Sequence, residues 1–520
     1  MQVVWFKRDL RIIDHAPLTE AAQRGPVLAL HVHEDALLSG PDADARHLGF
    51  LSEALDDLEA SLRMIGLQLL RLRGTLPDVL DALRRERRID ALWSHEETGN
   101  FASFRRDRDV AAWCRANGVV WHECPNGAVV RRLRDRDEWS ARWMETMRRS
   151  PLSAPSRVTP ASLSLRSVAS PPTAVELGLV SHDIPLRQRA SRVAALRELD
   201  DFLDQRVIRY RRGMSSPLSA VDDCSRLSPY LAFGLVSLRE VVHAVWRARA
   251  HWMAQVPGPQ TSAVLAGLKS FESRLHWHCH FIQKLESQPE IEFQPVNRLY
   301  EGLREADFSA QRHAAWCRGE TGYPLIDACM RSLAATGWIN FRMRAMLVSF
   351  SSYQLWNHWR EPALHLARMF TDYEPGIHYP QVQMQSGVTG INTLRIYNPV
   401  KQQADQDPKG IFVRRWLPEL SRVPLVLLAE PWRMTVTEQH AAGCLIGRDY
   451  PLPVVDHLAA ARAARDAVWA IRKMPEAGAE ARRVFTQHGS RNPQREGAPR
   501  RRGSKENAAP TDTPQMGFDF

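Results

Sequence analysis

The chain has 520 residues, 44% of them hydrophobic and 25% charged, which is the composition of a folded globular protein and leaves room for two domains. Lys and Arg number 69 against 59 Asp and Glu, so a net charge of +10 permits a polyanionic partner, although an arginine-rich tail would produce it too. Seven scattered cysteines argue against a disulfide scaffold, and the N-terminal charges and short apolar runs argue against a signal peptide or membrane span. We therefore expect a cytoplasmic protein.

Residues 1–130 alternate short apolar segments with amphipathic stretches. The segments rich in apolar and β-branched residues are 3–6, 27–32, 67–72, 91–94 and 119–122. Stretches such as 51–62 and 76–83, which lie between them, have the period of amphipathic helices. This order predicts an α/β domain in which helices cover both faces of a Rossmann-like parallel sheet.

The rest of the chain divides into a connection, a helical domain and a tail. Residues 131–195 lose the periodicity and place prolines among serines, which predicts an interdomain connection. Residues 196–475 predict an all-helical domain, in which Ser237 and Glu240 have the spacing of a capping box and Pro324 opens a helix. In that helix Asp327 and Arg331 are spaced as an ion pair. Residues 476–520 are polar and basic, and we expect a disordered tail.

The segment DDCSRLSP, residues 222–229, is the first candidate site. Ser225 and Ser228 carry hydroxyl groups just before a helix that we expect to start near Pro229. Free backbone N–H groups and the helix dipole favour phosphate at such a place. An ordinary N-cap serine explains the same residues when they are seen alone.

A second candidate pairs arginines with acids. Arg342 and Arg344 end a helix-like segment, and Asp372 and Glu374 follow it. A buried arginine needs an acceptor, and an Arg–Asp pair could hold a flat, anionic cofactor. A structural ion pair between helices is the alternative explanation.

Aromatic and histidine residues supply two further candidates. Trp277, Trp316, Trp338, Trp356, Trp359 and Tyr373 could stack on bases or relay electrons, although most must belong to the core. His276 and His280 share a helix face, but no third ligand lies nearby, so we expect no metal site. The sequence has no P-loop, dinucleotide-binding or nucleophile-elbow motif, which disfavours kinases, dehydrogenases and hydrolases.

Taken together, these motifs resemble the photolyase/cryptochrome family. The opening segment VVWFKRDLRIIDHAPL is similar to the first strand and the R-D-L-R loop of that family, and CSRLSPYLAFG is similar to its phosphate loop. The segments TGYPLIDACMRSL, TGWINFRMRAM and RIYNP are similar to its flavin-binding bowl. The resemblance covers residues 1–470 apart from the connection.

The resemblance implies FAD in the helical domain, with Arg344 and Asp372 beside the flavin ring. The implied cofactor-binding residues are Tyr210, Cys224, Ser225, Leu227, Ser228, Phe271, Trp338, Arg344, Asp372 and Glu374. The implied substrate-binding residues are Arg226, Arg274, Trp277, Phe341 and Arg342, and the implied catalytic residues are Trp277, Arg342, His378 and Trp359. A second, antenna chromophore of the folate or deazaflavin type belongs to the family, and its identity stays open here.

Several positions depart from the family's pattern. Cys224 replaces a threonine of the phosphate loop, Arg274 replaces a glutamate and Phe341 replaces an asparagine of the substrate pocket. His378 stands where an asparagine or aspartate usually faces the flavin N5 atom. Val382 and the region of Ala306 lack two tryptophans of the usual electron relay, which leaves Trp359 with Trp356, Tyr373 or Tyr379 as alternatives. These changes suggest a divergent bacterial branch, similar to the photolyases of cyclobutane pyrimidine dimers.

The implied function is light-driven repair of pyrimidine dimers in DNA by a deoxyribodipyrimidine photolyase. Reduced FAD would donate an electron to a cyclobutane dimer that has flipped out of the duplex. Two alternatives stay open: a cryptochrome-type blue-light photoreceptor, and a six-four photoproduct photolyase that would use His276, His278 or His378.

Two predictions concern partners. We expect a monomer that binds damaged DNA. The chain ends with Gln515, Phe518 and Phe520, which are spaced as in the short peptides by which bacterial repair proteins bind the sliding clamp. A random hydrophobic terminus explains these residues equally well.

Overall fold

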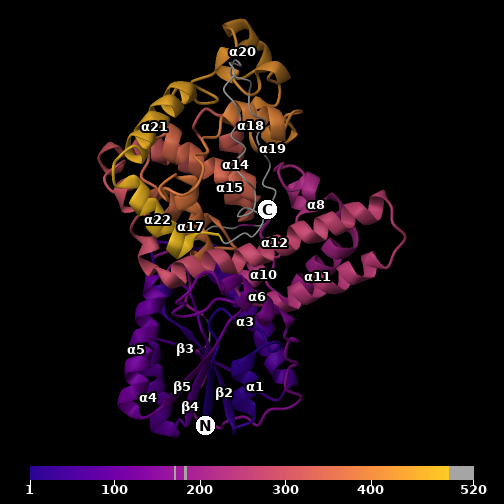
Figure 1. The fold of residues 1–520 in the computed structure, drawn as a ribbon, viewed down its shortest axis with the longest axis vertical. Helices are drawn as coiled ribbons and strands as arrows, with labels where there is room; N and C mark the ends of the chain where they lie inside the picture. Colours follow the sequence, from indigo (N-terminus) through magenta and orange to yellow (C-terminus); the bar gives the residue numbers. More distant parts are fainter. Residues whose placement is uncertain (169–170, 181–183, 185, 491–520) are drawn as a thin grey trace.

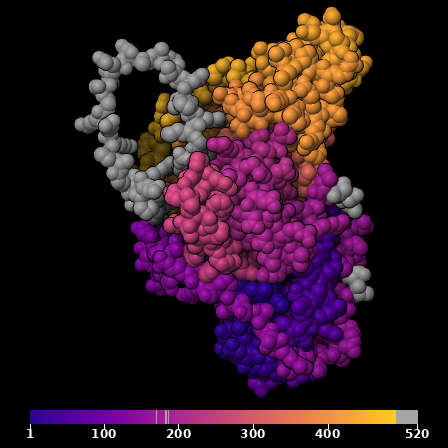
Figure 2. Space-filling model, turned by 90° about the vertical axis from the view of Figure 1, so that its right-hand side faces the viewer, coloured from indigo at the N-terminus to yellow at the C-terminus, as the bar shows by residue number. Residues whose placement is uncertain are grey.

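The computed structural model describes residues 1–168, 171–180, 184 and 186–490. The molecule is elongated, with the N-terminal sheet at one end and the helices of the second domain at the other (Figure 1). The view from the side in Figure 2 shows the same arrangement, with the N-terminal residues below and the residues coloured orange above. No helix in the described ranges has the length and apolarity that crossing a membrane requires.

The N-terminal domain is built on a five-stranded sheet with the order β3-β2-β1-β4-β5. All neighbouring strands are parallel, which confirms the predicted fold class. The strands are β1 (Gln2–Trp5), β2 (Val27–His33), β3 (Leu69–Arg73), β4 (Ala91–His95) and β5 (Val120–Cys124). The connecting helices are α1 (Ala16–Ala22), α2 (Asp35–Leu38), α3 (Ala45–Met64), α4 (Leu76–Glu86) and α5 (Phe101–Asn117).

Helices cover both faces of the sheet (Figure 1). Val4 and Phe6 belong to the same apolar cluster as residues of α1 and α3, whereas Val3 and Trp5 cluster with residues of α4 and α5. Successive residues of a strand point to opposite faces, so this alternation buries both sides of β1.

The connection contains the helix α6, and the second domain is helical. The α-helices are α6 (Trp139–Arg148), α7 (Arg192–Asp201), α8 (Val207–Gly213), α9 (Ala220–Asp223), α10 (Ser228–Ala232), α11 (Leu238–Met253), α12 (Pro259–Ser287), α13 (Ala310–Arg318), α14 (Pro324–Thr336), α15 (Phe341–Ser349), α16 (Arg360–Met369), α17 (Pro375–Gln385), α18 (Pro399–Gln406), α19 (Ile411–Trp416), α20 (Val436–Ala442), α21 (His457–Arg472) and α22 (Ala477–His488). Two π-helical segments are η1 (Phe202–Arg206) and η5 (Phe350–Gln354). The 3-10 segments are η2 (Pro289–Glu292), η3 (Arg298–Tyr300), η4 (Glu305–Asp307), η6 (Pro418–Leu420), η7 (Leu425–Leu427) and η8 (Pro431–Arg433).

Local sequence signals are mostly realised, with one exception in α14. The capping box of Ser237 and Glu240 opens α11, and Pro324 opens α14. The predicted pair between Asp327 and Arg331 is wrong. Asp327 is fully buried and accepts hydrogen bonds from Thr321 and Tyr450, among others, because a buried carboxylate needs several donors. Arg331 instead pairs with Glu419 at 2.8 Å.

The segment after residue 476 differs from the expected disordered tail at its start. Residues 477–488 form α22, and Val484 on this helix is fully buried. Arg483 Nη2 donates to the carbonyl of Val296 at 2.8 Å, and Glu480 accepts from the amide of Arg298 at 3.1 Å. One buried apolar side chain and these anchors hold in place a helix that the polar composition of the segment conceals. The clamp hypothesis on Gln515, Phe518 and Phe520 lies outside the described residues.

The R-D-L-R loop joins the two domains. Arg8 Nη2 donates to the carbonyl of Tyr373 at 2.5 Å, and Arg11 Nη1 donates to the carbonyl of Gly234 at 3.2 Å. Gly234 has a φ of 69°, and a Cβ atom there would collide with the backbone of Arg8. This motif therefore positions one domain against the other.

Candidate cofactor site

The Arg344–Asp372 pair is the centre of the candidate site. Arg344 Nη2 donates to Asp372 Oδ2 at 2.8 Å, and its Nε donates to the carbonyl of Ile339 at 2.8 Å. The guanidinium carbon lies 4.0 Å from the ring centre of Phe370. The structure thus brings together two residues that are far apart in the sequence, and it fixes the arginine by three contacts.

Buried polar atoms without a partner lie on this pair and on residues close to it in the chain. Asp372 Oδ1, Thr371 Oγ1, Asn340 Oδ1 and Arg342 Nε are buried and form no hydrogen bond. The amide of Thr371 donates to the carbonyl of Gly337 at 2.9 Å, which places this segment against the turn that carries Trp338. Buried polar groups are nearly always bonded, so the orphaned atoms fit a polar ligand such as the flavin ring of FAD, which offers both donors and acceptors.

Arg226 connects the predicted phosphate loop to Trp338. Its guanidinium carbon lies 3.9 Å from the Trp338 ring centre, and its backbone has a φ of 58°. Gln188 holds this conformation: its Nε2 donates to the Arg226 carbonyl at 3.0 Å, and its Oε1 accepts from Arg226 Nη2 at 2.9 Å. Burial lowers the pKa of Arg226. The loop with Ser225, Leu227 and Ser228 is therefore braced beside the candidate site.

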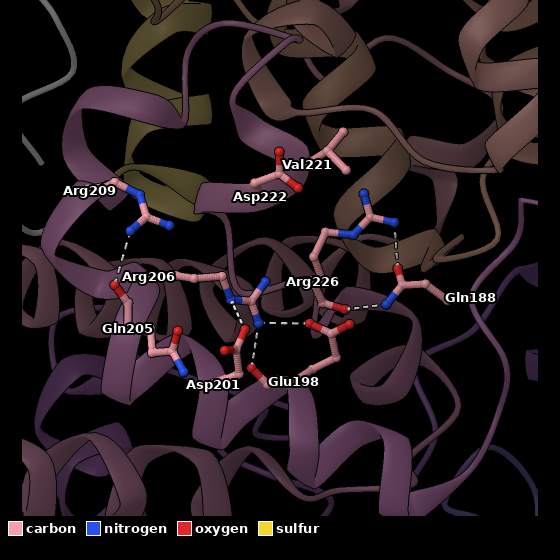
Figure 3. Close-up of a pocket in the computed structure, with 9 residues that line it drawn as sticks. All are labelled: Gln188, Glu198, Asp201, Gln205, Arg206, Arg209, Val221, Asp222 and Arg226. Carbon is pink, nitrogen blue, oxygen red and sulfur yellow. Dashed lines mark hydrogen bonds and ion pairs between the residues drawn. The ribbon is translucent and has the colours of Figure 1, made fainter.

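A surface cavity of about 430 Å³ opens beside Arg226 (Figure 3). The residues that line it are Gln188, Glu198, Asp201, Gln205, Arg206, Arg209, Val221, Asp222 and Arg226. Arg206 pairs with Glu198 and Asp201 within this cavity, each at 2.7 Å. Arg226 therefore both lines the cavity and contacts Trp338.

Cys224 precedes the loop as a neutral thiol. Burial raises the pKa of Cys224 to about 12, so the thiol keeps its proton at neutral pH. Its carbonyl accepts from Arg206 Nη1 at 2.9 Å. The side chain is thus a weak donor at a position where the sequence resemblance led us to expect a hydroxyl.

Tyr210 and Phe271 lie together on facing helices. Their ring centres are 6.0 Å apart, and Phe202 packs against both. Burial raises the pKa of Tyr210 to about 12, and Arg274 opposes this shift. The structure therefore places Arg274 beside Tyr210, on the same helix α12 that carries Phe271.

Trp277 and Arg274 occupy neighbouring turns of α12. Arg274 Nη2 lies 4.0 Å from Met214 Sδ, and Asn340 Nδ2 donates to the carbonyl of Met214 at 3.0 Å. Asn340 precedes Phe341, which is the first residue of α15. The Phe341 side chain is 39% exposed. The loop around Met214 therefore bridges the two helices that carry the predicted substrate-binding residues.

His378 is a neutral imidazole within α17. Its Nε2 donates to the carbonyl of Ala363 at 2.8 Å, and burial lowers its pKa to about 4. The rings of Phe370, Tyr373 and Tyr379 pack around it. With its proton on Nε2, His378 can offer only an acceptor at Nδ1. Burial also raises the pKa of the Glu374 carboxyl, and the positive charge of Arg8 opposes this shift.

Two tryptophans lie near the predicted electron route. Trp359 is fully buried at the start of α16. Trp356 has a φ of 56°, and its Nε1 donates to Asp307 Oδ2 at 3.2 Å, next to Ala306. Arg304 lies 4.6 Å from the Trp356 ring centre. Trp356 thus lies near the region of Ala306, where the sequence lacks a tryptophan of the electron relay. The contact with Asp307 joins residues 49 positions apart in the chain.

The histidines do not assemble as a metal site on α12. His276 packs between the rings of Trp139 and Trp143, at 4.9 and 5.0 Å. His280 Nδ1 accepts a hydrogen bond from Arg136 Nη2 at 2.6 Å, which occupies its lone pair.

A different cluster, which the sequence did not reveal, lies at the end of the sheet. Ligand atoms of Asp9, His15 and His95 lie within 4.8 Å of one another, and all three residues are buried. Asp9 Oδ2 accepts from His15 Nε2 at 2.9 Å and from His95 Nδ1 at 2.7 Å. His15 Nδ1 in turn accepts the amide of Leu18 at 3.1 Å and so caps α1. Because both nitrogens of His15 are committed, the cluster is a hydrogen-bonded anchor and does not suit a metal ion.

Comparison with known families divides the chain as the fold does. Residues 2–140 match the family described as DNA photolyase. Residues 271–470 match the family described as the FAD binding domain of DNA photolyase. The second match contains the Arg344–Asp372 pair and the orphaned atoms around it.

Individual proteins are similar over nearly the whole chain. A deoxyribodipyrimidine photo-lyase of Streptomyces griseus is 31% identical over 477 residues, which is 89% of this chain and 97% of that protein. A cryptochrome DASH of Gloeobacter violaceus is 29% identical over 495 residues, which is 90% of this chain and 95% of that protein. Among solved structures, a bacterial class III photolyase from Agrobacterium tumefaciens superposes with a TM-score of 0.78 at 25% identity, covering 91% of this chain and 98% of that one.

Proposed function

The chain belongs to the photolyase and cryptochrome family with an FAD-binding domain, and we propose that it repairs cyclobutane pyrimidine dimers in DNA by a light-driven reaction. The observation that carries the proposal is the face of α12 with Arg274 and Trp277, which the Met214 loop links to Asn340 at the start of α15, the helix that carries Arg342 and Arg344. It combines an indole for stacking with cations for phosphates. A relative that is 31% identical is itself called a deoxyribodipyrimidine photo-lyase, which supports the same activity.

The residues of the site divide the work between cofactor and substrate. When bound in its reduced form, FAD supplies a strongly reducing electron after absorbing light. Arg344 and Asp372 would hold and orient its polar ring edge, while Ser225 and Ser228 would bind its phosphates. Trp277 would stack on the extruded pyrimidines, and flipping them out costs a few kcal/mol, least where damage has already weakened pairing.

The neutral histidines favour cyclobutane dimers over six-four photoproducts. Burial lowers the pKa of His276 and His278 to about 4, and the same holds for His378. None of the three is protonated at neutral pH, as a catalytic acid would need to be. Phe341 and Arg274 would instead contact the dimer through an aromatic face and a cation.

Electrons for restoring the reduced flavin would pass through Trp359 and Trp356. Trp359 is fully buried, whereas Trp356 is partly exposed and lies next to Asp307 at the surface. A buried and a partly exposed indole three residues apart in the chain would pass an electron from solvent inward. The cytoplasmic location that the sequence predicts would place the protein with its DNA substrate.

A photolyase assay decides the proposal. The fully reduced protein is illuminated with an oligonucleotide that contains a thymine dimer, and the absorbance of intact thymine is followed. We expect that absorbance to recover in the light and to stay constant in the dark. No recovery after complete reduction would rule out repair, and a flavin photocycle without dimer loss would instead support the photoreceptor function that the similarity to a cryptochrome DASH suggests.

A further inference from the structure

A second group of basic side chains lies on and around α12 beyond Trp277, and we propose that it binds a phosphate-type oxyanion. We call it the basic cluster, and its members are Arg136, His280, Lys284 and His488. His280 and Lys284 are one helical turn apart on α12, Arg136 precedes α6, and His488 ends α22, which packs against α12. This inference does not depend on the repair activity.

The proton of His280 is fixed in a position where it has no acceptor. Arg136 Nη2 donates to His280 Nδ1 at 2.6 Å and to the His280 carbonyl at 3.3 Å. A guanidinium can only donate, so the neutral ring must carry its proton on Nε2. That Nε2 atom is buried without a partner, on a residue that is 3% exposed. An unpaired buried N–H is costly, and an anion would satisfy it.

His488 offers a second nitrogen of the same kind. Its Nε2 lies 2.6 Å from Gln288 Oε1, which fixes the ring. Its Nδ1 is buried without a partner, and the residue is 1% exposed. When Nε2 donates to the glutamine, Nδ1 is the atom that a second proton would occupy, and the ring would then present an N–H there.

The electrostatic surroundings of these residues are basic. After burial, the groups that lower the pKa of His280 most are Lys284, Arg136, His276 and His488. Burial and then Arg136 lower the pKa of Lys284 to about 7, and burial with Lys284, Arg136 and Arg483 lowers the pKa of His488 to about 3. An anion among these groups would reverse these shifts, because it favours their protonated forms.

The chemistry of the donors selects a tetrahedral oxyanion. The cluster offers an ammonium, a guanidinium and two imidazoles from α12, α22 and the segment before α6, and phosphate has enough oxygen atoms to accept from all of them. The aromatic rings of Trp139 and Phe281 lie next to Arg136 and Lys284, at 4.7 and 4.9 Å, and they reduce competition from water. Lys284 is partly exposed and supplies the side from which the anion can enter.

The phosphate could be free or part of a nucleic acid. His280 also contacts Trp277, with ring centres 4.6 Å apart, so the basic cluster adjoins the indole on which a base would stack. Both sources share the same chemistry, and the experiment distinguishes them.

Calorimetric titration of the full chain with inorganic phosphate tests the inference. It is done in two buffers of different ionisation enthalpy, because binding should take up protons on Lys284 and the histidines. We expect Lys284→Gln to lower the affinity about tenfold, as loss of a charged hydrogen bond does. Lys269→Gln, an exposed lysine on the same helix, should not change it. His488→Gln serves as a second variant if Lys284→Gln melts at a lower temperature.

Three results would overturn the inference. Absence of phosphate binding, wild-type affinity in both Lys284→Gln and His488→Gln, or binding without proton uptake would each contradict it. A short single-stranded oligonucleotide then identifies the source. If the oligonucleotide competes with phosphate, and if Lys284→Gln binds the oligonucleotide more weakly than the wild type does, the site binds a nucleic-acid phosphate. If the oligonucleotide leaves phosphate binding unchanged, the site binds the free anion. A protein that fails to repair dimers would leave both of these results unaffected.

Discussion

Two buried aspartates show the difference between an anchor and a binding site. In the N-terminal domain, both oxygens of Asp9 are occupied: Oδ1 accepts the amide of Lys7 at 2.7 Å, and Oδ2 accepts from His15 and His95. In the helical domain, Asp372 gives one oxygen to Arg344 and leaves Oδ1 buried without a partner. A buried charge is therefore not itself a sign of function, whereas an unpaired lone pair in a buried position is.

The end of the sheet repeats this lesson on a larger scale. The strand order changes between β1 and β4, and ligands of doubly wound sheets bind at such a point. Here Lys7 pairs with Asp107 at 3.7 Å, and Arg131 pairs with Glu123 at 2.7 Å. Glu286 of α12 accepts from Thr98 at 2.6 Å, which ties this network to the helical domain. Ion pairs join the charged residues there to one another, although Lys7 Nζ forms no hydrogen bond, and the network links the two domains.

Removing the anchor should have the largest effect on stability. Asp9→Ala leaves His15 and His95 buried without their shared acceptor, and we expect the free energy of unfolding to fall by roughly 3–5 kcal/mol. Burial tends to raise the pKa of Asp9, but the two histidines lower it well below its usual range, so this contribution to stability is present above the unfolded pKa and is lost as the pH falls.

Chemical denaturation of the apoprotein measures this loss. Refolded Asp9→Ala should still bind FAD with the affinity of the wild type, because no contact of Asp9 reaches the candidate site. Weakened FAD binding in the folded variant would contradict the assignment of Asp9 as an anchor.

Removing the aspartate of the binding site should act on the cofactor. Asp372→Ala deletes the partner of Arg344, and we expect FAD affinity to drop by about 2–3 kcal/mol, as for a charged hydrogen-bonded pair in an interface. Fluorescence of released flavin at increasing dilution measures it. The apoprotein should lose less stability than Asp9→Ala does, and the opposite ranking would remove the distinction between the two aspartates.

How much of this could be seen in the sequence depends on the range of the contacts. The five strands and the capping box follow from local periodicity, and Arg344 with Asp372 was predicted because both belong to a recognised motif. Asp9, His15 and His95 were missed, because His95 follows Asp9 by 86 residues and only the parallel sheet brings them together. The contact between Trp356 and Asp307, and that between Arg136 and His280, are hidden in the same way. Composition also concealed α22, whose burial rests on one apolar side chain and its anchors.

Removing Gln188, which braces the phosphate loop, should have a smaller and indirect effect on FAD affinity. Gln188→Ala removes both hydrogen bonds to Arg226, and the left-handed backbone there would relax, so we expect FAD affinity to fall by about 1 kcal/mol. Gln205→Ala is the matched control, since Gln205 lines the same cavity without bonding Arg226 through its side chain (Figure 3). The dissociation rate of FAD compares the two variants, and equal rates would show that the brace is not needed.

A carboxylate at the domain junction should give a stability that depends on pH. Glu292 Oε2 accepts the amide of Phe101 at 2.6 Å, and burial raises the pKa of Glu292 to about 7. The folded state thus keeps a proton that the unfolded state has lost, and stability falls as the pH rises from about 4.5 to 7. Glu292→Gln keeps the acceptor without the charge, so it should be more stable than wild type by about 1 kcal/mol at pH 8 and unchanged at pH 5. The exposed Glu290→Gln should show no such crossover in a denaturation series.

The smallest effect concerns a donor that the site lacks. Cys224 presents a neutral thiol, which donates weakly, where a hydroxyl would donate well to a phosphate. We expect Cys224→Thr to tighten FAD binding by roughly 0.5–1 kcal/mol, the net value of one hydrogen bond. Cys224→Ala should bind like the wild type, because the thiol contributes little. If the alanine variant instead loses affinity while the threonine variant gains none, the thiol itself is a ligand. Cys224 would then join Asp372 among the residues whose polar atoms wait for the cofactor as a hydrogen-bond partner.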